Sequence, residues 1–163
     1  MNVKRSYRLL FIFFLLITNI SCDQVSKAIV RQRVDYHENI PLIDSYFTLT
    51  RVENTGAFLS LGNALPNYLK IIILSLLPML VIGFGIFYLS MKQEVNKIGL
   101  IGFCFIIGGG IGNIFDRIVY GSVTDFLHIK VGILQTGVFN LADVSIMIGT
   151  GIILAFSFLK HTS

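Results

Sequence analysis

Two aspartates, Asp125 and Asp143, have the residue type and the positions for acid–base chemistry. Asp125 follows the third of four strongly apolar stretches, and Asp143 lies about one turn inside the fourth. Charged side chains at such depths in a membrane are costly and usually face a cavity or a partner. Two neighbouring carboxylates do not easily both ionise, so one holds a proton while the other acts as a base. The pair therefore predicts one shared proton and an activated water between the two acids.

The composition places these residues in a membrane protein. The 163 residues are 54% hydrophobic and 13% charged, with a mean hydropathy of +0.77, more apolar surface than a soluble domain of this size can bury. Four apolar stretches, at about 9–29, 69–89, 98–118 and 138–159, are each long enough to cross roughly 30 Å of hydrocarbon. We expect one membrane-embedded domain over 1–163, an α-helical bundle of four transmembrane helices. The pI near 9.2 does not indicate nucleic acid, because the basic residues are scattered and form no stripe.

Basic residues predict the orientation of the four spans. They are dense in short flanks beside the span ends: Lys4, Arg5, Arg8, Lys92, Lys97 and Lys160. Short basic flanks stay in the cytoplasm, so both termini are expected there and the long segment 31–68 on the other side. Of the nine acidic residues, Glu94 alone falls on the cytoplasmic side, which locates the acidic chemistry at the outer face.

The outer segment reads as strands, not as a fifth span. Residues 46–52 are β-branched and aromatic, and they lie between Pro41 and the turn Asn54-Thr55-Gly56, which predicts a small extracytoplasmic β-sheet formed within about 40–61. Asn67 to Lys70 predicts a short interfacial helix before the second span.

Polar residues inside three of the spans converge on one membrane level, near the outer ends. Helical spacing places together Asp23 with Lys27, then Asn113 with Asp116 and Arg117, and then Asn140 with Asp143. Lys27 is expected to pair with Asp23, and Arg117 lies next to Asp116. Asp125 and Asp143 are then the acids without a local cation, which favours catalysis over a structural ion pair.

Glycines in the third span indicate close helix packing. They are Gly102, Gly108, Gly109, Gly110 and Gly112. Small residues let helix backbones approach where lipid gives no hydrophobic drive for association.

Other interpretations of these residues remain open. Asp125, His128 and Asp143 could ligate a catalytic zinc, although no paired-Cys or HExxH spacing accompanies them. A proton- or ion-coupled transporter subunit would also use buried acids, but here the polar groups lie at one level and form no path across the bilayer. A noncatalytic assembly factor could use the outer sheet for docking. The basic N-terminus, apolar run and Cys22 look like a lipoprotein signal peptide, but cleavage there would discard most of the first span.

With these residues laid out, the chain resembles the lipoprotein signal peptidases, also called signal peptidase II, over nearly its whole length. Five blocks in order carry the resemblance: Asp23-Gln24-Val25-Ser26-Lys27, Arg51-Val52-Glu53-Asn54-Thr55-Gly56-Ala57-Phe58, Gly109-Gly110-Ile111-Gly112-Asn113-Ile114-Phe115-Asp116-Arg117, Val123-Thr124-Asp125-Phe126 and Phe139-Asn140-Leu141-Ala142-Asp143. Each block alone is weakly specific. Together, in this order, they are highly specific.

The resemblance implies an aspartic endopeptidase without a cofactor, located in the bacterial inner membrane with its site near the outer face. It would cut diacylglyceryl-modified prolipoproteins just before the lipidated cysteine, and it would be a target of globomycin-type inhibitors. Asp125 and Asp143 would form the catalytic dyad. Residues that would shape or support the site are Asp23, Lys27, Asn54, Gly56, Asn113, Asp116, Arg117 and Asn140. Membrane lipid is the expected surrounding, and the enzyme is expected to act as a monomer.

Overall fold

The structure, a computed structural model, describes residues 3–44, 46–56, 64–92 and 95–161. Glu94 and the segment 57–63, which includes Ala57 and Phe58 of the second motif block, lie outside the described residues. The same holds for the side chains of Lys4 and Lys160.

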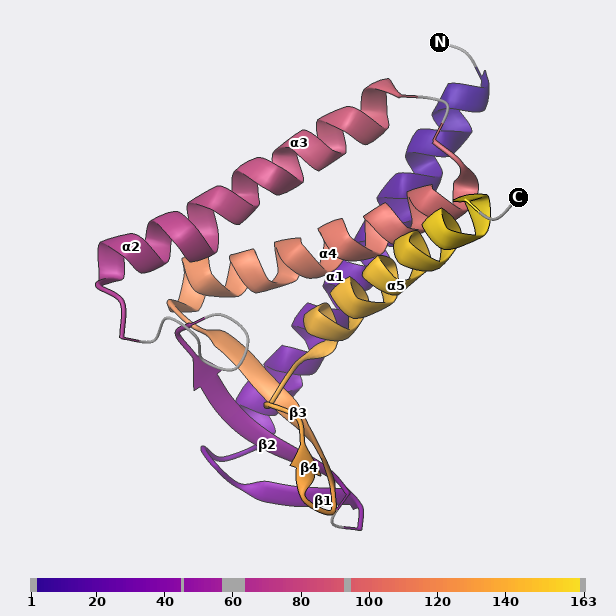
Figure 1. The fold of residues 1–163 in the computed structure, drawn as a ribbon. Coiled ribbons are helices and arrows are strands. Elements are labelled where there is room, and N and C mark those ends of the chain that lie inside the picture. The colour runs from indigo at the N-terminus through magenta and orange to yellow at the C-terminus, as the bar shows by residue number, and fades with distance from the viewer. Residues whose placement is uncertain (1–2, 45, 57–63, 93–94, 162–163) are drawn as a thin grey trace.

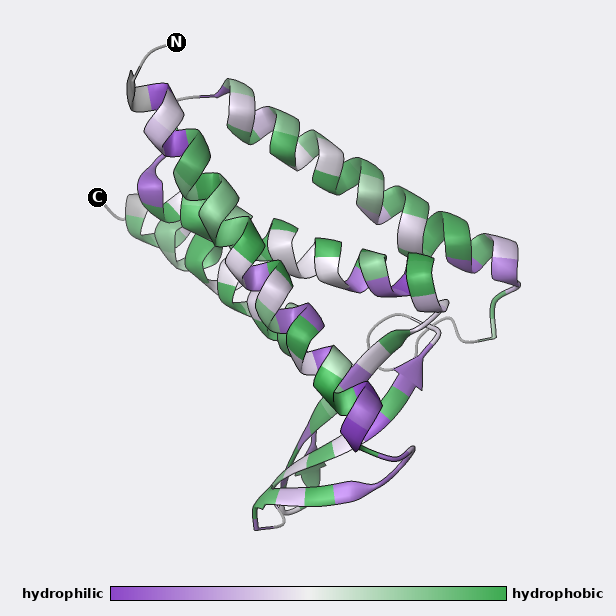
Figure 2. Cartoon of the chain, turned by 180° about the vertical axis from the view of Figure 1, so that it is seen from behind, coloured by the Kyte–Doolittle hydropathy of each residue, from purple (hydrophilic) through white to green (hydrophobic). Residues whose placement is uncertain are grey.

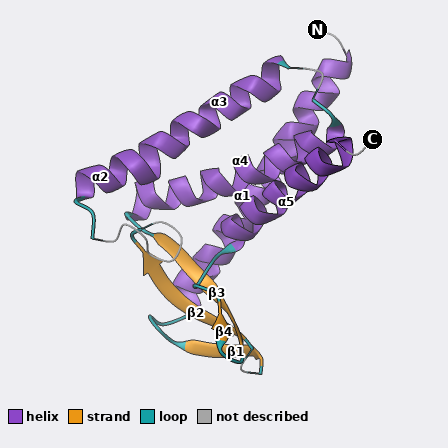
Figure 3. Cartoon of the chain, in the orientation of Figure 1, coloured by secondary structure: helices purple, strands orange, loops and turns teal. Residues whose placement is uncertain are grey.

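Four long helical rods make up most of the chain (Figures 1 and 3). They are α1 (Val3–Arg33), the continuous rod of α2 (Asn67–Ile71), η2 (Ile72–Leu76) and α3 (Leu77–Met91), then α4 (Lys97–Tyr120) and α5 (Leu141–His161). All four are long and apolar enough to cross a membrane, which confirms the predicted four-helix architecture. The fourth rod begins at Leu141, later than the apolar stretch that predicted it, because Asn140 caps it.

The second rod begins with the short helix that was predicted at Asn67 to Lys70. That segment is helical, but it runs into the span without a break through the π-helical turn η2. Pro78 lies two residues beyond η2. A proline ring clashes with the carbonyl four residues earlier and lacks an N–H, and a π-turn is one way for a helix to absorb this defect. The predicted short helix is therefore the first turn of a longer rod.

A four-stranded antiparallel sheet lies at one end of the helices, opposite to the end where both termini lie (Figure 1). Its order is β1 (Asn39–Ile43), β2 (Phe47–Asn54), β3 (Val123–Val131) and β4 (Leu134–Gln135). The small sheet is confirmed, but two of its strands come from the connection between the third and fourth spans, which sequence analysis left unassigned. The β-branched run Val123 to Val131 followed by Gly132, at φ +60°, was an available hairpin signal.

The sheet is fixed to the C-terminal end of α1 by a small apolar cluster. Val30 of α1, Val34 just after it and Phe126 of β3 are buried together, with Leu49 and Leu141 packed against them. Arg51 of β2 also donates to the carbonyl oxygen of Arg31 at 2.8 Å. Figure 2 shows that the helices are largely hydrophobic on their surfaces, with hydrophilic bands on α1 and α4 toward the sheet. The polar level predicted from sequence therefore lies beside the sheet.

Glycines of α4 allow the close helix packing that the sequence indicated. A Cβ at Gly102 would lie 2.8 Å from the Ile153 side chain of α5, and one at Gly108 would lie 2.8 Å from Asn19 of α1. At Gly112 the nearest atom would be a carboxylate oxygen of Asp23, at 2.5 Å. The glycines thus let α1 and α5 pack against α4. At Gly112 the missing side chain leaves room for the Asp23 carboxylate.

Candidate active site

Asp143 is held by the start of α5. The Asn140 side chain accepts the backbone N–H of Asp143 at 2.9 Å, and the Asp143 side chain accepts the backbone N–H of Asn140 at 3.2 Å. This reciprocal pair is a capping box, with asparagine at the N-cap and the acid three residues later. The residues that begin the helix therefore also orient the Asp143 carboxylate.

Asp125 is held by the sheet. Strand β3 follows α4 after Gly121, whose φ of +77° ends the helix, and Asp125 lies opposite Val52 of β2. A bulge in β2 between Leu49 and Val52 shifts the register just before this pair. The sheet thus brings Asp125 back to the helices, where it meets Asn140 of α5.

Three asparagines bind the two carboxylates as donors. Asn54 and Asn140 donate to the two oxygens of Asp125 at 3.0 and 2.6 Å, and Asn113 donates to Asp143 at 2.8 Å. The carbonyl oxygen of each amide accepts from a group that can only donate there: the Gly56 N–H, the Asp143 N–H and the Lys27 ammonium, each at 2.9 Å. These contacts fix the orientation of all three amides. The Nδ2 groups must therefore face the acids.

Asp125 and Asp143 line one small cavity together with Asn54, Asn113 and Arg117. The volume open to a water molecule in this cavity is about 20 Å³. A single water molecule needs a volume of about 10–15 Å³ by this measure. The cavity therefore has room for one water with several polar partners. The arrangement can hold a water in contact with two acids.

Burial changes the acidity of Asp125. Its side chain is 4% exposed, and removal from solvent raises the pKa of Asp125 to about 6. The hydrogen bond from Asn54 opposes this rise in pKa, and the nearby charge of Asp143 adds to it. Asp125 can therefore hold or release a proton close to neutral pH, as general acid–base catalysis requires.

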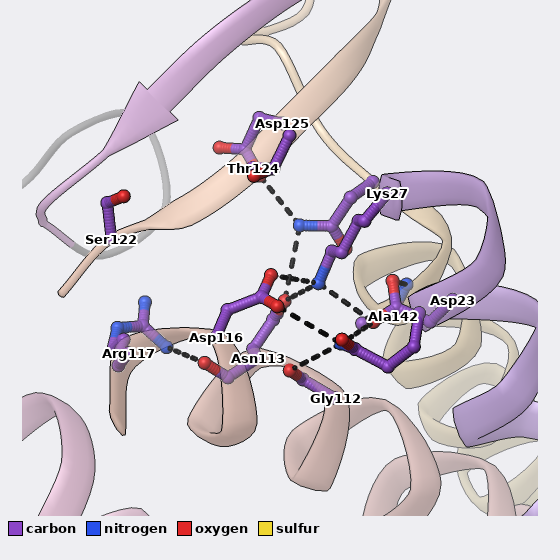
Figure 4. A network of polar contacts seen from close by, with 12 residues as sticks. Asp23, Lys27, Gly112, Asn113, Asp116, Arg117, Ser122, Thr124, Asp125 and Ala142 are labelled. Atoms are coloured by element: carbon purple, nitrogen blue, oxygen red, sulfur yellow. Dashed lines mark hydrogen bonds and ion pairs between the residues drawn. The ribbon is translucent and has the colours of Figure 1, made fainter. Parts of the chain in front are cut away.

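A cluster of ion pairs lies next to the cavity (Figure 4). The ammonium of Lys27, fully buried, lies 2.8 Å from Asp23 and 2.9 Å from Asp116. Asp23 also accepts the backbone N–H of Ala142, at the first turn of α5. The predicted pairing of Asp23 with Lys27 is confirmed, and the Lys27 ammonium bonds Asn113 as well. This Lys27 cluster thereby joins α1, α4 and α5 behind Asp143.

This cluster extends toward the sheet through Arg31, Thr124 and Glu53, which were not predicted from the sequence. Arg31 lies 2.8 Å from Asp116 and donates to Thr124 at 2.8 Å, and Thr124 contacts Glu53 of β2 at 3.0 Å. A signal for Arg31 was present, because Asp23, Lys27 and Arg31 are spaced four apart and share one face of α1. The Lys27 cluster therefore continues into the two strands that position Asp125.

Arg117 has different partners from those expected. Asp116 pairs with Lys27 and Arg31, while Arg117 donates to the carbonyl oxygens of Gly56 at 3.0 Å and Asn113 at 3.4 Å. Adjacent helical residues point about 100° apart, which explains why sequence neighbours do not pair here. The expectation that Arg117 neutralises Asp116 is wrong, and Arg117 instead lines the aspartate cavity.

The metal interpretation finds no geometric support. His128 lies three residues beyond Asp125 on a strand, so its side chain is on the opposite face of the sheet. Within the described ranges, no three His, Cys, Asp or Glu side chains are grouped to hold a metal ion. The zinc site proposed as an alternative therefore does not form from these residues.

Comparison with known proteins identifies the family. A model of the family described as signal peptidase (SPase) II matches residues 15–159. The chain belongs to the signal peptidase II family. It is 36% identical over 154 residues to the lipoprotein signal peptidase of Fusobacterium nucleatum, covering 94% of this chain and 88% of that protein. It is 37% identical over 136 residues to that of Clostridioides difficile, covering 83% and 86%.

A solved structure has the same fold. It is a bacterial membrane enzyme determined by the in meso method at 2.3 Å resolution, with a TM-score of 0.78 at 23% identity, covering 97% of this chain and 90% of that one. Membership of the signal peptidase II family makes the chain an enzyme, and its four long apolar helices make it an integral membrane protein. Its structure gathers the predicted site residues from five separate parts of the chain around one cavity and its adjoining cluster.

Proposed function

We propose that this signal peptidase II removes the signal peptide from diacylglyceryl-modified prolipoproteins, cutting just before the lipidated cysteine, with Asp125 and Asp143 as the catalytic acids. The observation that carries the proposal is the water-sized cavity lined by both aspartates, at the level where the bundle meets the sheet. No cofactor takes part in the proposed reaction. A lipidated signal peptide is held in the bilayer, so its scissile bond is presented at such a level.

In the proposed reaction, one carboxylate takes a proton from the water as it attacks the scissile carbonyl. The other, protonated carboxyl gives its proton to the carbonyl oxygen as the tetrahedral intermediate forms. When the C–N bond breaks, the first carboxyl passes the water proton to the leaving nitrogen, and the second takes its proton back from the intermediate. Asn54, Asn113 and Asn140 hold the acids in place as neutral donors, which restricts their movement without placing a cation on either carboxylate. Arg117 supplies a positive charge beside a pair that carries one net negative charge when a single proton is shared.

The remaining residues act as supports. Gly56 lies beside Arg117 and orients Asn54, while Asp23, Lys27 and Asp116 hold α1 and α4 against the start of α5. The proposed site needs no residue from a second copy of the chain, and action as a monomer is part of the proposal. The basic flanks support both termini in the cytoplasm, the sheet outside the inner membrane, and the site near the periplasmic or outer face.

The decisive test uses purified protein and a synthetic diacylglyceryl prolipoprotein, with mass spectrometry of both products. We expect a released signal peptide and a product that begins with the lipidated cysteine, unchanged by EDTA and inhibited by globomycin. A substrate that lacks the diacylglyceryl group is the matched control and should be cut far more slowly. Loss of cleavage in EDTA would contradict the two-aspartate mechanism, and absence of cleavage would contradict the function.

A further inference from the structure

A second pocket shares Arg117 with the aspartate cavity but contains neither aspartate in its lining. It has a volume of about 320 Å³ and is lined by α2 and η2, by the end of α4, and by Thr55 after β2. Arg117 lines both this pocket and the aspartate cavity. We call it the rim pocket, since it opens where the second rod meets the sheet end of the bundle. Pockets of this size accommodate small-molecule groups.

All the polar side chains of the rim pocket can donate hydrogen bonds, and two of them are cationic. Lys70 and Arg117 are accompanied by Asn67, Ser75 and Thr55, and the described lining contains no acidic residue. The Lys70 ammonium contacts the Thr55 hydroxyl at 3.3 Å, and the ion pairs found among the described residues involve other cations. Because the aspartate pair compensates Arg117, Lys70 contributes positive charge without an acid beside it.

The rest of the pocket wall is apolar and continues onto lipid-facing surface. Ile71 and Leu74 line the pocket, and Ile71 is 62% exposed. Tyr68, one turn before Ile72, is 64% exposed, and exposed tyrosines at the ends of spans mark the headgroup level of a bilayer. The ligand that fits is therefore an anionic, acceptor-rich group with apolar chains attached below it.

We propose that the rim pocket binds the phosphate of an anionic phospholipid, with Lys70 as its principal cation and the acyl chains along Ile71 and Leu74. A lysine beside a lipid phosphate is a charge-assisted contact, and basic residues at the membrane surface attract anionic lipid. This site is separate from cleavage of the prolipoprotein. A lipid held there would form part of the wall beside Arg117.

Lipid binding can be measured without any cleavage assay. The protein is placed in nanodiscs of phosphatidylcholine with a minority of phosphatidylglycerol, released into mild detergent, and examined by native mass spectrometry for retained lipid. We expect wild type to retain phosphatidylglycerol, Lys70→Gln to retain it about five-fold less, the effect of one basic residue near a lipid surface, and Lys70→Arg to restore it. Lys130→Gln, which removes an exposed cation from β3, is the matched control and should behave as wild type.

Three results would overturn the proposal. Equal retention by wild type and Lys70→Gln would remove Lys70 from the site, and a loss in Lys130→Gln as large as in Lys70→Gln would mean general attraction to a basic protein. Displacement of the lipid by soluble glycerol phosphate would assign the pocket to a free phosphate compound in place of a lipid. Thermal unfolding of each variant checks that it is folded, and prolipoprotein cleavage, assayed separately, tests the proposed function on its own.

Discussion

Two polar regions lie side by side at the sheet end of this enzyme, and they hold their acids in different ways. In the Lys27 cluster, Asp23 and Asp116 each lie 2.8–2.9 Å from a cationic nitrogen. In the aspartate cavity, Asp125 and Asp143 are held by amide and backbone N–H groups. A contacting cation strongly favours the ionised form of an acid, whereas the amide donors favour it more weakly, and at Asp125 they do not outweigh the effect of burial. This difference supports the proposal that Asp125 and Asp143, and not Asp23 and Asp116, take part in catalysis.

The largest effect is expected from the aspartate cavity. Asp125→Asn and Asp143→Asn keep the shape of the side chain but remove its acid–base function, so each should lower the rate of prolipoprotein cleavage by roughly 10²–10⁴-fold or more. The rate is measured on the purified variants by product mass spectrometry. Asp44→Asn, an exposed acid near the sheet, is the matched control and should retain activity. Near-normal cleavage by either dyad variant would take that residue out of the mechanism.

Substitutions in the Lys27 cluster should lower the stability of the protein. Lys27→Met leaves Asp23 and Asp116 buried with one fewer cation, and breaking a buried pair this way costs about 3–5 kcal/mol of unfolding free energy. Unfolding of the protein in mixed detergent micelles gives this quantity. The double variant Lys27→Met with Asp23→Asn restores charge balance and should recover part of the loss. If the double variant were less stable than Lys27→Met, charge balance would not be the function of the cluster.

The raised pKa of Asp125 predicts a dependence of stability on pH. Between the ordinary pKa of 3.8 and the native value of about 6, the native state binds more protons at Asp125 than the unfolded state does. The contribution of Asp125 to stability therefore falls as pH rises through this window, by roughly 3 kcal/mol, and stays at its lower level above it. Unfolding free energies at pH 4 and pH 7 should differ less in Asp125→Asn than in wild type. Identical differences would show that Asp125 titrates normally.

The smallest effect is expected from the packing between the two regions. A Cβ at Gly112 would lie 2.5 Å from an Asp23 oxygen, so Gly112→Ala should displace the carboxylate and reduce the unfolding free energy by about 1–3 kcal/mol. At Gly151 of α5 a Cβ meets nothing within 4 Å. Gly151→Ala is therefore a control within the same membrane region, where no loss is expected. A loss of equal size at both positions would mean that helix glycines matter here for reasons other than contact with Asp23.

The four spans and the level of the polar groups could be predicted from sequence, because both follow from local periodicity and from the cost of charge in a bilayer. Contacts between distant segments could not. The partners of Asp116 depend on how α1 packs against α4, and helical neighbours alone pointed to Arg117. The orientations of Asn54, Asn113 and Asn140 depend on three separate donors from different elements. The strands after α4 were missed for another reason, since their pattern was present but was taken as a connection.

The capping box of α5 links the activity of the enzyme to the folding of its last helix. The hydrogen bonds between Asn140 and Asp143 belong to the first turn of α5 and exist only where that turn is formed. A chain that is still entering the bilayer, or whose final helix has frayed, would lack a working pair of acids. The enzyme would then become active only when its fold is complete, and other proteins in the same membrane would not be cleaved before that point.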